Sequence, residues 1–157
     1  KGFDMRLFFQ GVMKRDYFQG SYYFWGANNS IWNSTCMEPH LDYFREDADH
    51  PLGQNLDSYF PRPVFYSTRN QHTQTRYLQN AAYIRLKNIQ LGYTLPNSLT
   101  DKLKISKLRF YVSGENLWTG TKLIDVFDPE TIDGGWENNG NAYPLSKTIS
   151  VGLSLNF

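Results

Sequence analysis

The last ten residues alternate between apolar and small or polar side chains, and the alternation continues to the final residue. The two sets are Ile149, Val151, Leu153, Leu155 and Phe157, and Thr148, Ser150, Gly152, Ser154 and Asn156. A period of two places successive side chains on opposite faces of a β-strand. Chain ends usually fray unless other structure holds them. A terminal Phe on the apolar face therefore predicts a strand that is docked at its end.

Three further segments show the same period and predict three more strands. Residues 107–118 alternate around Leu108, Phe110 and Val112. Residues 83–94 also alternate, but their phase slips by one residue at Lys87-Asn88, which predicts a β-bulge. With a segment at the start of the chain, the expected strands lie near 2–16, 83–95, 104–118 and 147–157. Each has about ten residues, against about five or six in most globular proteins.

The connections between these strands differ greatly in length. Residues 95–104 form a short turn, whereas residues 17–82 and 119–147 form long connections. In an antiparallel up-and-down meander, alternate connections leave at opposite ends of the sheet, so both long connections emerge at one end. Outer-membrane β-barrels have this asymmetry, with short periplasmic turns and long extracellular loops. The pattern predicts an all-β meander of about four long strands with two long loops.

Composition excludes several classes of function. Lys and Arg total 16 against 15 Asp and Glu, and the basic residues form no cluster, which argues against a nucleic-acid partner. The single cysteine, Cys36, cannot form an internal disulfide and offers no paired thiol ligands. No apolar run approaches the roughly 18 residues of a membrane helix, although a barrel strand spans the bilayer with only about 9–11.

The sequence does not support a catalytic or metal-binding motif. Four carboxylates share one loop, namely Asp125, Asp128, Glu130 and Asp133. Paired carboxylates can hydrolyse glycosides or hold Ca²⁺, but the D-x-D-x-D-G spacing is missing, so solvated loop residues are the favoured interpretation. The histidines have no HExxH motif and are expected on the surface: His40, His50 and His72. We expect no enzymatic activity, no cofactor and no metal.

Aromatic residues of the long loops are better candidates for binding. Flat rings stack on sugars, and Tyr and Trp are favoured at interfaces generally. The candidates for contact with a ligand or partner are Trp25, Trp32, Asp128, Glu130 and Trp136. Two alternatives stay open for the rings, which either pack one loop on another or belong to an aromatic girdle of a barrel. Tyr93 and Trp118, at strand ends, are expected in such a girdle.

Residues 83–96 read YIRLKNIQLGYTLP and resemble a motif, YLRLKNITLGYTLP, near the end of the SusC/RagA-type TonB-linked receptors. Three later stretches follow in the family's order and spacing: LRFYVSGENLW at 108–118, FDPE at 127–130 and YPLSKT at 143–148. The resemblance is strong over residues 76–157 and thin over residues 17–75. The chain is therefore similar to the C-terminal barrel segment of these receptors.

The end of the chain also resembles the assembly signal of outer-membrane barrels. That signal combines a polar residue, a glycine, apolar positions and a terminal Phe. Here Ser150, Gly152, Leu155 and Phe157 fill those places. The alternative is a terminal strand that ends in Phe for packing alone.

The resemblance implies that residues 1–157 form the last strands of a plugged barrel of about 22 strands, with no plug in this chain. The family imports glycans or peptides across the outer membrane of Gram-negative bacteria. The implied partners are the rest of the barrel and plug, a SusD-like surface lipoprotein, the TonB complex through the absent N-terminal part, an oligosaccharide or peptide substrate, and outer-membrane lipid. The implied orientation has a periplasmic C-terminus and extracellular long loops.

The alternative function is that of a soluble β-sandwich ligand-binding module. In a sandwich the apolar strand faces form a buried core, whereas in a barrel they face lipid. Four strands cannot close a barrel, and each unsatisfied backbone group at an open edge costs several kcal/mol in hydrocarbon. The barrel interpretation therefore expects both edge strands to pair with the rest of a longer receptor.

Overall fold

The computed structural model describes residues 2–26, 35–64, 67, 69–132 and 142–157. The chain divides into two compact units, which we call the sheet unit and the loop unit. The sheet unit comprises Lys1–Met13, Ala82–Thr121 and Leu145–Phe157. The loop unit comprises Lys14–Ala81 and Lys122–Pro144. In the described part of the chain, no helix is both long enough and apolar enough to cross a membrane.

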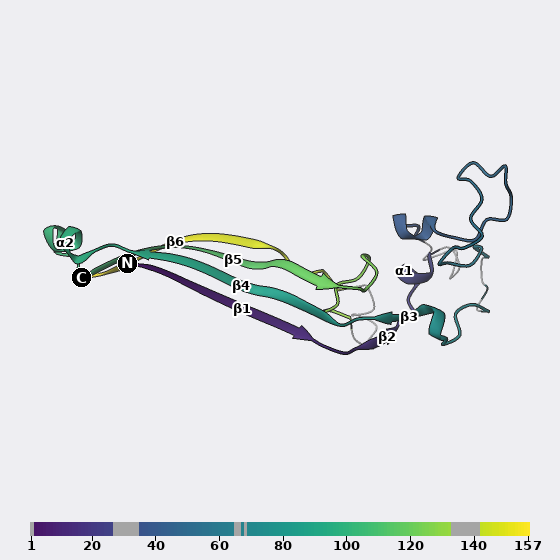
Figure 1. Cartoon of the computed structure of the whole chain (residues 1–157), viewed down its shortest axis with the longest axis horizontal. Coiled ribbons are helices and arrows are strands. Elements are labelled where there is room, and N and C mark those ends of the chain that lie inside the picture. Colours follow the sequence, from purple (N-terminus) through teal and green to yellow (C-terminus); the bar gives the residue numbers. More distant parts are fainter. Residues whose placement is uncertain (1, 27–34, 65–66, 68, 133–141) are drawn as a thin grey trace. The chain divides into compact units, whose positions relative to one another are not determined.

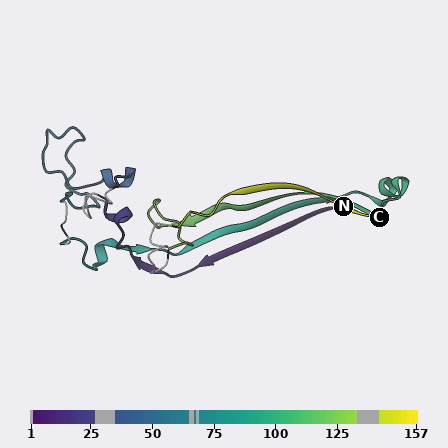
Figure 2. The ribbon, with the colours of Figure 1, turned by 180° about the vertical axis from the view of Figure 1, so that it is seen from behind.

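The sheet unit contains an antiparallel four-stranded sheet in the order β1-β4-β5-β6. Its strands are β1 (Phe3–Val12), β4 (Tyr83–Thr94), β5 (Lys107–Thr121) and β6 (Thr148–Asn156). They lie side by side along their length in both views (Figures 1 and 2). Each strand pairs with the next long strand along the chain, so the predicted up-and-down meander is confirmed.

Three strand boundaries differ clearly from those expected from the sequence. β5 (expected near 104–118) begins at Lys107 and not 104, because a helical turn occupies Asp101–Leu103. β1 ends at Val12 and not near residue 16, because its partner β4 begins at Tyr83, directly opposite Val12. β5 continues to Thr121 and not 118, because Thr121 still pairs with Tyr83. The ends of the strands are therefore set by the partner strand, which periodicity within one strand cannot reveal.

The bulge expected at Lys87-Asn88 is present. Asn88 pairs with Phe8 and Leu86 with Phe9, so Lys87 is the extra residue. The neighbouring strand β5 contains a second irregularity at the same level of the sheet, at Asn116, where φ is 53°. Asn tolerates this left-handed conformation better than most residues. Each bulge adds one residue relative to the neighbouring strand and increases the local twist.

The short connection between β4 and β5 folds into helical turns. It contains α2 (Asn97–Thr100) and η4 (Asp101–Leu103), and Lys104 ends it in a left-handed conformation with φ 56°. β1 starts and β6 ends at the same end of the sheet as α2 (Figure 1). Both long connections therefore leave the sheet at its opposite end.

In the loop unit, a small sheet joins the two ends of the first connection. β2 (Asp16–Phe18) pairs in antiparallel fashion with β3 (Leu78–Asn80). The described residues between these strands include the short helical turns α1 (Tyr22–Trp25), η2 (Glu38–Leu41) and η3 (Thr75–Tyr77). The small sheet closes the first connection into a compact loop.

Both connections contribute to one hydrophobic core of the loop unit. The first supplies Phe24, Trp25, Phe60, Tyr77 and Ala81, and the second supplies Leu123, Phe127 and Ile132. Arg15 also donates hydrogen bonds to the carbonyl oxygens of Pro129, at 3.1 Å, and Ile132. Residues 122–132 thus bury their apolar side chains against the first connection, so the described parts of the two connections fold as one unit.

Candidate functional site

The four-stranded sheet has one apolar face and one polar face, and the apolar face is exposed. Opposed residues on neighbouring strands share the same character, as in the row Met5, Leu91, Val112 and Val151. The side chain of Phe3 is 83% exposed and that of Val151 is 80% exposed. Large contiguous apolar patches on a protein surface usually mark contact with another protein or with a membrane.

Aromatic rings lie toward both ends of this apolar face. Phe3, Tyr93 and Phe110 form one row near the short connection, and the ring centroids of Phe3 and Tyr93 are 4.6 Å apart. Trp118 lies toward the other end, opposite Leu86. The β5 segment from Phe110 to Trp118 has about the length, 9–11 residues, that a tilted strand needs to cross a bilayer. Aromatic rings at these two levels match the girdles of a transmembrane barrel.

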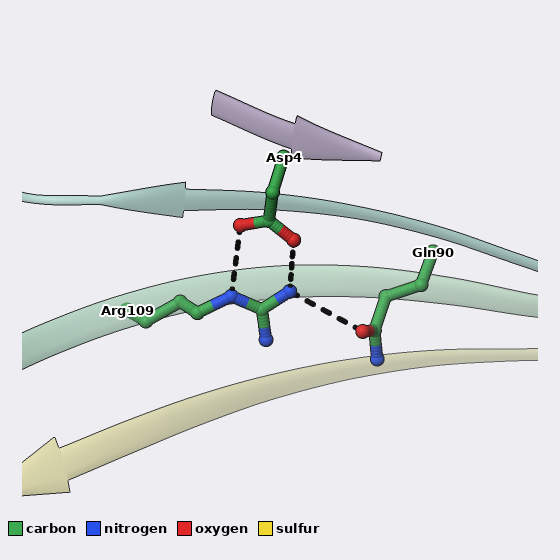
Figure 3. Close-up of polar contacts among 3 residues, drawn as sticks. All are labelled: Asp4, Gln90 and Arg109. Carbon is green, nitrogen blue, oxygen red and sulfur yellow. Dashed lines mark hydrogen bonds and ion pairs between the residues drawn. The ribbon is translucent and has the colours of Figure 1, made fainter. Parts of the chain in front are cut away.

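The polar face carries an ion pair that crosses a strand (Figure 3). Arg109 on β5 donates from Nε to Oδ1 of Asp4 on β1, at 3.0 Å, and from Nη2 to Oδ2, at 2.5 Å. The same Nη2 donates to Oε1 of Gln90 on β4, at 3.2 Å. A bidentate pair of this kind fixes the guanidinium in position. Sequence reasoning missed it, because only the register of β1, β4 and β5 brings these residues together.

The structure buries Trp25, one of the residues predicted to contact a ligand. Its side chain is 1% exposed, and its ring lies edge-on to those of Phe24 and Tyr77, with centroid distances of 5.1 and 4.8 Å. In this conformation the ring is not available for stacking on a ligand. Burial favours the packing alternative for Trp25. Its indole Nε1 has no hydrogen-bond partner among the described residues.

His40 is half-buried, so the expectation of a surface histidine is wrong there. The backbone N–H of Met37 donates to its Nδ1, at 3.0 Å. Nδ1 is thus an acceptor, and Nε2 carries the proton and donates to the carbonyl of Phe24, at 3.0 Å. Next to it, Gly26 has φ 54°, and a β-carbon there would lie 2.9 Å from Nδ1 of His40. The hydrogen bond between His40 and Phe24 therefore holds the end of α1 in place. Gly26 has no β-carbon, so it tolerates both the positive φ and the close approach of the His40 ring.

The remaining histidines differ from one another. His50 is half-buried, with Nε2 3.2 Å from the hydroxyl of Tyr43, and His72 is exposed as expected. Tyr59 is partly buried and packs against the core of the loop unit, where burial and then the neighbouring Tyr77 raise the pKa of its hydroxyl above the usual value. Tyr59 therefore stays protonated, and it accepts a hydrogen bond from Nε2 of Gln79. These polar contacts serve the packing of the loop unit.

Asp128 and Glu130, the two acidic candidates, lie in one turn of the second connection. Oδ1 of Asp128 accepts the backbone N–H of Glu130 at 2.9 Å, and the carbonyl of Asp128 accepts the N–H of Thr131 at 3.1 Å. Both residues are half-buried. Across the described residues, no group of His, Cys, Asp and Glu is arranged to hold a metal ion. The other two candidates, Trp32 and Trp136, lie outside the described residues.

The residues of the predicted assembly signal lie on or just after β6. Ser150 and Gly152 are on the polar face, opposite Ser113 and Tyr111, and Leu155 is on the apolar face opposite Leu108. Phe157 follows the last strand residue and is 89% exposed. The alternating pattern places these residues as expected, and their role in assembly stays a prediction.

Comparison with known proteins identifies the family. No family model matches the chain. Two curated proteins of Formosa agariphila, "TonB-dependent receptor P3" and "TonB-dependent receptor P26", are 32% and 28% identical to it over 100% and 99% of its length. All of the chain also superposes on part of two solved structures, a "RagAB peptide transporter" (25% identity, TM-score 0.63) and a "RagAB peptide importer in the 'closed-closed' state" (29%, 0.67). This chain is a barrel segment of a SusC/RagA-type TonB-dependent receptor.

The receptor segment spans only a small part of these relatives. It corresponds to 15% and 16% of the two curated receptors and to 16% of each solved chain. The resemblance read from residues 83–96 and the later motifs is thereby confirmed, as is the fold class. The receptor belongs to the outer membrane, and the sheet of this segment is part of a barrel that the chain does not close by itself.

Proposed function

We propose that the receptor segment is the C-terminal part of an importer that carries peptides or glycans across the outer membrane. The observation that supports this most is the exposed apolar face, which crosses all four strands and ends in aromatic rings. In a barrel such a face contacts lipid, and the polar face lines the interior. The solved relatives are described as a peptide transporter and a peptide importer, which favours a peptide as the substrate here.

The alternative, a soluble β-sandwich, has less support. A sandwich buries the inner face of each sheet in a core about 10 Å thick. Phe3, Val151 and Ile149 on the apolar face are 83%, 80% and 73% exposed. Their exposure suits a lipid-facing surface, because hydrocarbon replaces the core that a sandwich would supply.

The proposal also assigns an orientation and partners. The two long connections lie outside the cell, while the short β4–β5 connection and the C-terminus lie in the periplasm, as in other outer-membrane barrels. The shared core of the loop unit lets the connections present a folded surface. A SusD-like lipoprotein is the proposed partner for that surface. The TonB complex acts through an N-terminal part of the receptor.

Cys36 offers a direct test of the orientation, because it is exposed in the loop unit. In intact cells that express the full-length receptor, we expect a membrane-impermeant maleimide to modify Cys36. Mass spectrometry of the receptor's peptides identifies the modified residue. As a control, Ser98→Cys in a Cys36→Ser background places the thiol in α2, where we expect modification only after the cells are broken. Modification of the Ser98→Cys receptor in intact cells, together with no modification of Cys36 in the unmodified receptor, contradicts the orientation.

Trp136→Ala tests the proposed contact of the second connection with the lipoprotein or the substrate. If Trp136 is a contact anchor, we expect its loss to weaken binding by about 1–3 kcal/mol, or roughly 5- to 150-fold in Kd. The measurements are co-purification of the lipoprotein with the full-length receptor and uptake of labelled oligopeptides and oligosaccharides by the same cells. Uptake of only one of the two substrate classes identifies the class that the receptor carries.

Two control variants separate contact from folding in this experiment. Trp118→Phe changes a ring on the apolar face of β5 and should leave capture and uptake unchanged. Trp25→Ala removes a buried ring, so it should make the loop unit sensitive to protease, whereas Trp136→Ala should not. Normal capture and normal uptake by the Trp136→Ala receptor, at normal surface expression, would remove Trp136 from the proposed interface.

A further inference from the structure

The alternating pattern of β6 does not determine its register against β5. A slip of two residues leaves every apolar side chain on the apolar face and every polar one on the polar face, because the side-chain period is two. Ile149, Val151, Leu153 and Leu155 resemble one another closely enough to exchange places after such a slip. On the polar face, however, Gly152 stands between two serines, and it is the one position there without a side chain.

The ring of Tyr111 lies across Gly152. The two residues are directly opposite each other on β5 and β6. A β-carbon added to Gly152 would lie 2.7 Å from Cε1 of Tyr111, and closer still to Cζ and the hydroxyl oxygen. Real β-carbons essentially never approach other atoms so closely. The Tyr111 ring therefore packs directly on the backbone of Gly152, and a side chain at residue 152 displaces the ring.

A second glycine accepts a crossing side chain in the same row of the sheet. Gly92 on β4 lies opposite Tyr111, and Asp4 on β1 lies opposite Gly92. A β-carbon on Gly92 would lie 2.6 Å from Oδ1 of Asp4 and 2.7 Å from Cζ of Arg109. The ion pair of Asp4 and Arg109 thus passes directly over Gly92. One row across the four strands holds both contacts.

We propose that Tyr111 and Gly152 fix the register of the terminal strand, and that the ion pair between Arg109 and Asp4, which crosses Gly92 of the same row, fixes that of β1 and β4. A slip of β6 by two residues brings Ser150 or Ser154 opposite Tyr111. The serine side chain then occupies the space that the Tyr111 ring fills in the native register. Only the native register places the glycine there. Fixing the register of the terminal strand concerns the closure of the barrel and does not depend on what the receptor imports. It gives Gly152 a function other than direct recognition by the assembly machinery.

Cross-linking in the full-length receptor tests the role of the pair. In a background without other cysteines, Ser113→Cys with Ser150→Cys reports the native register, because these residues are directly opposite. Ser113→Cys with Thr148→Cys reports a two-residue slip. We expect Gly152→Ser to reduce the native cross-link and the yield of folded, heat-modifiable barrel by about tenfold, as an overpacked site does. Ser154→Thr, which adds a methyl group elsewhere on this face of β6, should have little effect.

The decisive variant combines Gly152→Ser with Tyr111→Ala. Removal of the ring relieves the clash, so we expect the native cross-link and the folded yield to return to within about twofold of the unmodified receptor. No recovery in the double variant means that Gly152 acts without Tyr111, as a residue read directly by the assembly machinery, and overturns the proposal. A normal cross-link and normal yield for Gly152→Ser alone overturn it as well.

Discussion

Val112→Arg in the full-length receptor is expected to abolish most of the folded barrel. Val112 lies in the middle of β5 on the apolar face, opposite Leu91 and Val151. An Arg on the lipid face of a barrel costs about 2–4 kcal/mol at the bilayer midplane. This is a large fraction of the total stability of a typical domain. The measurement is the fraction of receptor that migrates as a heat-modifiable band in outer-membrane preparations.

Ser113→Arg is the matched control for this variant. Ser113 is the next residue of β5 and points to the polar face, opposite Gln90 and Ser150. Positions that face the interior of a barrel tolerate polar side chains, so we expect a yield near that of the unmodified receptor. Both changes lie outside the terminal strand and leave the predicted assembly signal intact. Equal losses in the two variants would mean that the two faces of β5 do not differ in environment, against the assignment of the apolar face to lipid.

The strands could be predicted from the sequence because their physical requirement is local. A strand with one apolar face must alternate, so β6 and the bulge at Lys87-Asn88 were visible in the order of side chains alone. The second irregularity, at Asn116, was not visible in the sequence, because the apolar side chains of β5 keep the same alternation before and after Asn116. The positions of Val12 and Thr121 at strand ends were also hidden, since both depend on where β4 begins.

The loop unit could not be predicted because its core has no period. Trp25, Tyr77 and Ile132 are far apart in the sequence, yet all three are buried in one cluster. Sequence reasoning recognised that the loops are rich in aromatic rings but left open whether these rings bind or pack. The same limit applies to Tyr111 and Gly152. A pattern of period two assigns each residue to a face and leaves its partner on the next strand undetermined.

Phe24→Ala is expected to unfold the loop unit while the strands of the barrel stay intact. Phe24 is fully buried, and its ring centroid lies 5.1 Å from that of Trp25 and 5.4 Å from that of Phe60. Truncation of a buried Phe to Ala costs about 3–5 kcal/mol, because a cavity replaces the ring. We expect new protease cleavage in both connections, within 35–64 and within 122–132. Limited proteolysis of the purified receptor with peptide mapping measures this.

Leu56→Ala serves as the control, because Leu56 belongs to the same unit but is 59% exposed. We expect its cleavage pattern to match that of the unmodified receptor. If Phe24→Ala exposes the first connection alone and leaves 122–132 resistant, the two connections do not depend on one core. If both become sensitive, any deletion that removes Leu123, Phe127 and Ile132 also unfolds the first connection. Loss of lipoprotein capture after such a deletion then reports the folding of the whole loop unit, and only single changes outside the core can locate the binding surface.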